Sequence, residues 1–504
     1  MTRKESAAKK EVREDAPEMT AIERNPFALL SASVRDDRKR IVELAEEKSF
    51  SGDHDACTKA RSDLTNPRNR LSCELSWLPG VAPKKANELI ALLRKDPEKL
   101  REAKGKVPAI AQANLIASAM ELLDDDLSVE EWAAWIKDLA AATDGIKAEK
   151  ILRDINEDRA ISGFTEVKGV ELIEAEINER LRAYKAAVKN ALERQEPEKL
   201  TDIVTLVVDE TTHHGENHAP TLIDDMVDVY ILGTQAFLRR EADKIIEALQ
   251  KIPLLASDGE TKVLAGIKTV KGAIEYWDKF AQPIQVSMKS RGMKHDLSRE
   301  LARELRDLLI GLASEHDMIK AASALTDILK EVFAELPDFA EQAEKDSSDL
   351  IALAERNERD AAEMSYEAQL GTIFKDKLAI SLKGIEWKGE KYPLESIKTV
   401  SWGGTRHSVN GIPTGTNYTI NFSDGNRSQT IETRKQEVYS EFIQRLWQGV
   451  CVRLMFEMLI AFQEGKKLHF AGIAVDDNGV ELTRAKFFKS EKVYVKWGDV
   501  HILN

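Results

Sequence analysis

Apolar residues recur at steps of three and four residues over most of the chain, from about Pro83 to Ala368. Such spacing places apolar side chains on one face of an α-helix. The stretches "EEWAAWIKDLAAA" and "VELIEAEINERLRAYKAAVKNALE" show the pattern most clearly. Ser128 and Glu131 in "SVEE" have the spacing of a capping box, which marks the start of a helix. The pattern predicts a helical body, of one or two domains, over residues 81–368.

After residue 374 the pattern changes to two-residue alternation. Short runs of β-branched and aromatic residues are separated by turns that contain glycine, which is typical of antiparallel strands. In "NYTINFSDGNRSQTIET", Tyr418, Ile420 and Phe422 alternate with polar neighbours, and Asp424-Gly425 fits a tight turn. We therefore expect a hairpin at this place and a β-rich domain around it.

The predicted fold class is α+β, with a mostly helical N-terminal two-thirds and a β-rich C-terminal domain that contains a long helix. That helix is predicted from about Gln436 to Glu464, and strands follow it. The glycine-rich stretch Ser401–Thr419 lacks the Lys-Ser/Thr ending of a phosphate-binding loop, so we interpret it as a long loop between strands. Trp387 and Trp402 are expected in the core. The expected domains are a disordered charged tail (1–24), a small helical module (25–80), the helical body (81–368) and the β-rich domain (374–504).

Composition narrows the functional classes. A formal net charge of −14 over 504 residues argues against binding to duplex nucleic acid, which requires a basic face. The three cysteines lack paired or metal-like spacing, as in proteins of a reducing compartment. The N-terminus has no apolar signal region, and no uninterrupted run of about 18 apolar residues occurs. We expect a cytoplasmic protein without a transmembrane segment.

The sequence contains none of the common catalytic motifs. It has no Walker loop, no dinucleotide-binding glycine motif and no GxSxG nucleophile elbow. "TTHHGENHAP" places His213, His214 and His218 within six residues, and imidazoles are ligands for zinc. Their spacing matches no common zinc module, so an exposed polar linker is the simpler interpretation. We expect no enzymatic activity, no cofactor and no metal site, with these histidines as weak candidates.

The stretch from Asn25 to Leu78 resembles the J-domain of co-chaperones that partner DnaK-type ATPases. The resemblance is carried by "NPFALL", by the basic "RKR" ahead of Ile41, and by "ACTKARSDLTNPRNR", in which Asn66-Pro67 matches the end of the family's third helix. It implies an antiparallel helix pair with a polar loop at its tip. The residues that it implies for partner binding are Arg38, Lys39, Arg40, Asp53, His54 and Asp55.

The loop of this module departs from the family at the residues that stimulate the ATPase. The family has His-Pro-Asp there, whereas this chain has "SGDHD", in which His54 and Asp55 are adjacent. Three interpretations remain: a structural or docking module with the J-like shape only, a divergent but working co-chaperone, or a chance likeness between helix pairs.

The C-terminal region, residues 374–504, resembles a pleckstrin-homology-like domain. The resemblance depends on the strand pattern and on "YPLESIKTVSW", which is similar to a strand–turn–strand of bacterial members of the class. Strands on both sides of the long helix suggest one elaborated module or two half-sized modules. The resemblance implies that basic residues near the first hairpin hold lipid phosphates, and a solvated strand edge is the alternative. The candidates are Lys383, Lys388, Lys391 and Arg406.

Together these features favour a non-enzymatic cytosolic adaptor or scaffold. Two interaction folds flank a helical spacer, and no reaction chemistry can be assembled from the motifs. Such a mosaic is compatible with a multi-component bacterial assembly, for example an anti-phage defence system. The alternatives are a specialised co-chaperone of a DnaK-type ATPase, a membrane-surface lipid sensor, and a metalloprotein centred on residues 213–218. The expected partners are therefore proteins, either a DnaK-type chaperone or an operon-encoded protein, with peripheral membrane contact as a further alternative.

Overall fold

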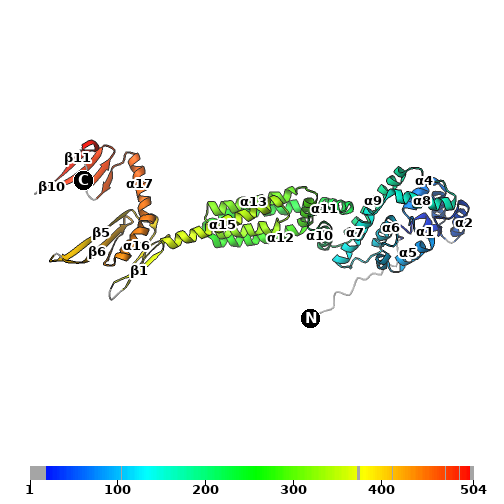
Figure 1. Ribbon diagram of the computed structural model, residues 1–504, viewed down its shortest axis with the longest axis horizontal. Coiled ribbons are helices and arrows are strands. Elements are labelled where there is room, and N and C mark those ends of the chain that lie inside the picture. Colours follow the sequence, from blue (N-terminus) through cyan, green and yellow to red (C-terminus); the bar gives the residue numbers. More distant parts are fainter. Residues whose placement is uncertain are drawn as a thin grey trace. The chain divides into compact units, whose positions relative to one another are not determined.

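The computed structural model describes residues 19–50, 52–103, 105–371, 375–410, 412–470, 473–486 and 489–499. The chain divides into two compact units, Met1–Leu350 and Ile351–Asn504. The described residues of the first unit are helical apart from their connections, and the second unit combines strands with a long helix (Figure 1). The predicted α+β class, helical first and β-rich afterwards, is confirmed. The boundary between the units falls inside one helix, α15 (Pro337–Met364).

The first unit places its helices in chain order with short connections. They are α1 (Pro26–Leu30), α2 (Arg38–Ser49), α3 (His54–Thr65), α4 (Pro67–Leu75), α5 (Pro83–Lys95), η1 (Pro97–Ala103), α6 (Ala109–Met120), α7 (Val129–Asp144), α8 (Ala148–Ser162), α9 (Val170–Glu193), α10 (Pro197–Thr212), α11 (Thr221–Lys251), η2 (Ile252–Asp258), α12 (Glu260–Ser290), α13 (Asp296–Ser314), α14 (Ile319–Val332) and the start of α15. The predicted capping box begins α7: the Glu131 N–H donates to Ser128 Oγ (3.2 Å), and the Ser128 N–H donates to the Glu131 carboxylate (2.8 Å).

The small N-terminal module is continuous with the rest of this unit. α2 packs against α3 through Ile41, Leu44 and Leu64, and the same buried core continues into α5, α6 and α7. The core also begins earlier than expected. Residues 1–18 of the predicted tail lie outside the described residues, but Ile22 is 1% exposed, and the Thr20 N–H donates to the Glu23 carboxylate (2.9 Å). The boundary predicted at residue 24 is therefore too late.

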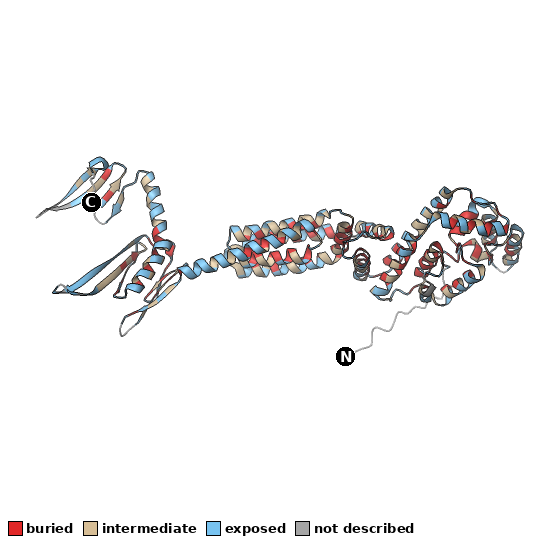
Figure 2. Ribbon diagram, in the orientation of Figure 1, coloured by how far each residue is buried: buried red, intermediate tan, exposed pale blue. Residues whose placement is uncertain are grey.

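Long helices make up the remainder of the first unit. α11, α12 and α13 lie along one another, and α14 packs on α12 and α13 (Figure 1). Figure 2 shows that the buried residues of these helices face the interior while their outer sides are exposed. This is the arrangement that a one-sided apolar stripe produces, because the stripe is removed from water only when helices meet along it.

The second unit begins with two antiparallel sheets. The first contains β1 (Tyr366–Leu370), β2 (Asp376–Ser381), β3 (Gly384–Trp387) and β4 (Glu390–Tyr392), and the second contains β5 (Thr399–Val409), β6 (Ile412–Ser423) and β7 (Ser428–Thr433). A short turn, η3 (Leu394–Ser396), connects them, and α16 (Gln436–Leu446) packs on strands of both sheets. Their shared core contains Ile380, Phe422 and Phe442.

Two details of this region differ from the prediction. The glycine-rich stretch Ser401–Thr419 is not a loop: it pairs along its length as the β5–β6 hairpin, in which Val409 lies opposite Ile412. Trp387 is 5% exposed and lies in the core as expected, but Trp402 is 41% exposed and contacts Trp447 edge to face instead. The predicted hairpin around Asp424-Gly425 is confirmed, with Gly425 at φ 93°.

The predicted long helix is continuous from α16 through a short π-helical turn, η4 (Trp447–Cys451), into α17 (Val452–Gln463). Among the described residues, Gln436–Gln463 is one helix that is long and apolar enough to cross a membrane by length and composition. It is a weak candidate, because its α16 half packs into the core of the second unit through Val438, Phe442 and Leu446.

A third sheet follows α17. It contains β8 (Leu468–Phe470), β9 (Ile473–Asp476), β10 (Gly479–Lys486) and β11 (Lys489–Lys496), and a short turn, η5 (Trp497–Asp499), comes after it. Each strand pairs antiparallel with the next. The prediction of strands on both sides of the long helix is therefore confirmed.

Candidate docking surfaces

The basic residues predicted to bind a partner lie on α2 and are exposed, but acidic neighbours pair with them. Arg40 forms ion pairs with Glu43 (3.3 Å) and Glu47 (3.2 Å), and Lys39 lies 3.9 Å from Glu43. Arg38 donates to the Thr65 carbonyl at the end of α3 (3.1 Å). The positive charge of Lys39 and Arg40 is therefore partly balanced by carboxylates of the same helix.

The loop between α2 and α3 uses its acidic residue structurally. Asp53 Oδ1 accepts hydrogen bonds from the N–H groups of Asp55 (2.9 Å) and Ala56 (3.2 Å), so this carboxylate caps α3. His54 and Asp55 are exposed on the first turn of that helix. Phe50, at the end of α2, is 93% exposed, and it is not among the residues that the J-like resemblance implies for partner binding. An exposed aromatic side chain beside a loop is a common protein contact.

The arginine that ends the J-like motif, Arg70, is buried and serves packing. Arg70 is fully buried, its Nε lies 2.7 Å from Glu74, and its guanidinium stacks 3.8 Å from the centre of the Phe164 ring. Arg159 of α8 pairs with the same carboxylate (2.8 Å). Burial also raises the pKa of Cys73 to about 12, which keeps this thiol protonated and unreactive. The arginine of this motif thus holds α4 against α8.

The histidine-rich loop follows α10. His213 and His214 both have positive φ, and the backbone N–H of His213 donates to the Asp209 carbonyl, as at a helix C-terminus. His214 Nδ1 lies 3.6 Å from the Asp209 carboxylate, whose pKa is raised by burial. Over the described ranges, no group of three or more His, Cys, Asp and Glu side chains, His218 included, is arranged to hold a metal ion.

The acidic residues that follow this loop on α11 form ion pairs. Asp224 and Asp228 lie four residues apart on one face of α11, and both pair with Arg291, at 3.1 Å and 2.7 Å. Asp225 pairs with Lys185 at 2.6 Å. These contacts attach α11 to α12 and α9, so the carboxylates stabilise helix packing.

The basic residues proposed for lipid phosphates are not gathered. Lys383 lies in the β2–β3 turn and Lys388 in the β3–β4 turn, so they occupy opposite ends of the short strand β3. Lys391 is on β4, and Arg406 is on the β5–β6 hairpin of the other sheet. The Lys388 ammonium lies over the Trp387 ring, 5.3 Å from its centre. Sequence proximity suggested one cluster, but the antiparallel sheet separates its members.

The most distinctive exposed surface of the second unit is an apolar face of α17. Along this helix, residues spaced by three and four positions form one stripe, and α17 contains no buried residue. We call it the α17 stripe: Val452, Met455, Phe456, Leu459 and Ile460, which are 39% to 63% exposed. A signal for this stripe is present in the sequence, since "VRLMFEMLIAF" is more apolar than a helix with one covered face requires.

The sheet β8–β11 presents a second apolar surface. Directly opposed residues in neighbouring strands share a face of a sheet. The register therefore gathers one set on a single face, which we call the β8–β11 apolar face: Leu468, Phe470, Ile473, Val475, Val480, Leu482, Val493 and Val495. Each member is at least partly exposed. The opposite face is mostly polar, although it includes the buried Ala474. On that face Glu481 pairs with Lys467 (2.8 Å) and Lys492 (2.6 Å).

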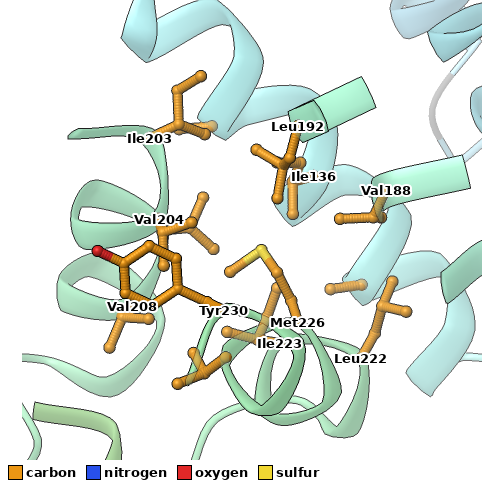
Figure 3. Packing of buried hydrophobic residues seen from close by; sticks show 14 of the residues in the cluster. Ile136, Val188, Leu192, Ile203, Val204, Val208, Leu222, Ile223, Met226 and Tyr230 are labelled. Atoms are coloured by element: carbon orange, nitrogen blue, oxygen red, sulfur yellow. The ribbon is translucent and has the colours of Figure 1, made fainter. Parts of the chain in front are cut away.

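The first unit contains a cavity of about 560 Å³ among α9, α10, α11 and α12. Figure 3 shows part of its wall, where Val188 and Leu192 of α9 lie near Met226 and Tyr230 of α11. The Tyr230 hydroxyl donates to the Phe280 carbonyl (3.0 Å). The lining of the cavity is mainly apolar, and Lys185, Lys189, Glu193 and Asp225 also border it.

Comparisons with known proteins found no match: no family model, no curated protein and no solved structure matches the chain.

Proposed function

We propose that the protein is a non-enzymatic adaptor that binds a protein partner through its C-terminal unit. The α17 stripe is the observation that carries this proposal. A helix of a folded domain normally buries its apolar stripe, and a large exposed apolar patch marks an interaction site. Half-exposed Phe456, Leu459 and Ile460 side chains are the aliphatic and aromatic anchors that fill pockets in a partner.

The attachment of α17 supports a docking role, because the helix is held firmly at its start. The Arg453 guanidinium donates to the carbonyl of Leu394 in the η3 turn (3.2 Å) and to that of Ile397 directly after it. A Cβ atom at Gly449 would meet Met364 Cε at 2.6 Å, so the π-helical turn lies directly against the end of α15. These contacts fix the direction in which α17 leaves the core, and a pre-ordered helix loses little conformational entropy on binding.

Two features of the J-like module are compatible with an adaptor that keeps the J-like shape. Asp53 is used as a helix cap, and Arg38 and Arg40 are engaged within the module. The second docking surface of the adaptor is therefore the exposed surface around Phe50 in the α1–α4 region.

Site-specific photo-crosslinking tests the proposal. A photo-reactive phenylalanine analogue placed at Leu459 of the full chain should give one dominant protein adduct in the cells that express it. The matched control position is Glu457, which is exposed on another face of the same helix. The adduct should disappear when Phe456→Asp is added, since a carboxylate disfavours an apolar contact. Equal protein yields from both positions, or adducts with lipid only, would refute docking through the stripe.

A further inference from the structure

The sheet β8–β11 repeats the construction of the first sheet, β1–β4. Both are antiparallel meanders of consecutive strands, and both are preceded by a helix and followed by a short 3-10 turn, η3 or η5. The third strand of each begins with a glycine that has no room for a side chain. A Cβ at Gly384 would lie 2.4 Å from the Tyr392 carbonyl oxygen, and one at Gly479 would lie 2.1 Å from the Val495 oxygen.

The two sheets differ in what covers them. The first sheet buries Leu378, Ile380 and Ile385 against β5–β7 and α16. In the second sheet the corresponding face is the β8–β11 apolar face, of which no member is buried by the described part of the chain. The turns show the same contrast: Leu394 in η3 is 7% exposed, whereas Trp497 in η5 is 45% exposed. The repeated sheet thus lacks the cover that the first sheet has.

The chain also contains a helix, α17, whose apolar stripe is exposed. The first sheet is covered partly by α16, whose buried residues Val438, Phe442 and Leu446 recur every four positions. The next helix, α17, has an apolar stripe with the same type of spacing, and none of its residues is buried. Its 12 residues span about 18 Å, and four strands about 4.8 Å apart span about 14 Å between the outer two, so one such helix can cross the whole sheet.

We infer that two copies of the chain pair reciprocally, with the α17 stripe of each copy packed on the β8–β11 apolar face of the other. A twofold axis makes the two contacts identical, which is the usual symmetry of a homodimer. Together the stripe and the face supply the apolar centre of an interface that buries about 800 Å² per partner, the size typical of a stable complex. The inference rests on the proposed docking role of the stripe and names its occupant.

The mass of the full chain in solution tests the pairing. Sedimentation equilibrium should give twice the chain mass for the wild type. Phe456→Asp in the stripe and Leu482→Asp on the sheet should each raise the dissociation constant at least about 100-fold, because each buries an unpaired carboxylate. His469→Asp is the matched control: His469 is exposed on the polar face of the same sheet, and its variant should remain dimeric. All three positions are exposed, and unchanged circular dichroism will verify folding.

Mixing the two variants tests reciprocity. A Phe456→Asp chain has an intact sheet, and a Leu482→Asp chain has an intact stripe, so a mixed dimer keeps one of its two contacts. The mixture should therefore form heterodimers that neither variant forms alone. Dimers lost in one variant and not restored by mixing would refute the reciprocal arrangement, since stripe-to-stripe or sheet-to-sheet pairing gives that result.

Other occupants of the stripe give distinct results. A wild type that is monomeric at about 100 μM, with Leu459 crosslinked to a different protein, would refute self-pairing and leave the adaptor proposal intact. A wild type that is monomeric and sediments with anionic lipid vesicles, with loss of sedimentation in Phe456→Asp, would refute both. Crosslinking of Leu459 to a second copy of the chain supports both.

Discussion

The carboxyl group of Asp278 gives a stability prediction whose sign and size follow from the structure. Asp278 lies on α12, Gln285 Nε2 donates to its Oδ1 (3.1 Å), and no cation pairs with it among the described residues. Burial, with a smaller contribution from the nearby Glu335 carboxylate, raises the pKa of Asp278 from 3.8 to about 7. The folded state therefore favours the protonated acid, whereas the unfolded chain ionises it near pH 4.

The sign of the pH dependence follows by linkage. A carboxyl with a raised folded pKa contributes stability that is fully present below about pH 4 and is lost as the pH rises to about 7. A shift of about three pKa units corresponds to about 4 kcal/mol. Asp278→Asn keeps the acceptor for Gln285 and removes the charge. It should raise the free energy of unfolding by up to about 4 kcal/mol at pH 8 and by about 1 kcal/mol at pH 4.5.

Urea unfolding of the full chain at the two pH values measures this difference, with the transition of the first unit as the readout. Asp349→Asn is the control, since Asp349 is exposed on α15 in the same unit. It should change the unfolding free energy by less than about 0.5 kcal/mol at either pH. An Asp278→Asn effect that is equal at pH 4.5 and pH 8, or that is destabilising at pH 8, would refute the reasoning that burial of an unpaired carboxylate limits stability.

Three substitutions test the packing of the two units by urea unfolding. Glu74→Gln leaves the buried Arg70 guanidinium without its carboxylate and should cost about 3–5 kcal/mol. Asn66→Ala removes the cap of α4 and should cost about 1 kcal/mol, and no measurable loss would mean that Pro67 alone starts the helix. Gly449→Ala forces Met364 to move and should destabilise the second unit by about 1–3 kcal/mol, whereas a neutral effect would show that the π-helical turn is loosely packed.

Two control substitutions show whether the losses of stability in Glu74→Gln and Gly449→Ala depend on burial and close packing. Glu88→Gln removes an exposed ion pair with Lys85 and should cost less than about 0.5 kcal/mol, so a loss as large as that of Glu74→Gln would contradict the role of burial. Gly272→Ala adds a methyl group in open space on α12, and there the lower entropy of the unfolded chain should give a gain of about 0.4–1 kcal/mol.

Local signals in the sequence predicted the helices well, because capping and proline effects act over a few residues. The Ser128–Glu131 box begins α7, and Asn66-Pro67 ends α3 and begins α4. Local signals gave a wrong prediction at Ser401–Thr419, where the glycines suggested a loop. Glycine weakens a strand by itself, but here the backbone groups of β5 and β6 pair with each other, and that ladder holds the hairpin.

The candidate sites depended on contacts that no local pattern contains. Lys383 and Lys388 are five residues apart in sequence, yet one strand separates them in the sheet. Arg70 was recognised as part of a motif, but its burial against Phe164 and Arg159 requires α8 to fold back onto α4. Phe50 and Trp402 are exposed because no other element packs fully over them, and their own sequence neighbourhoods do not show this.

The order of apolar and polar residues determined by itself where the helices and strands lie, because hydrogen bonding along a helix and alternation along a strand are set by adjacent residues. It also determined that α17 and the strands β8–β11 each have an apolar face. Only the tertiary structure decided that α16 covers its sheet while the α17 stripe stays exposed, since burial is a relation between elements distant in sequence.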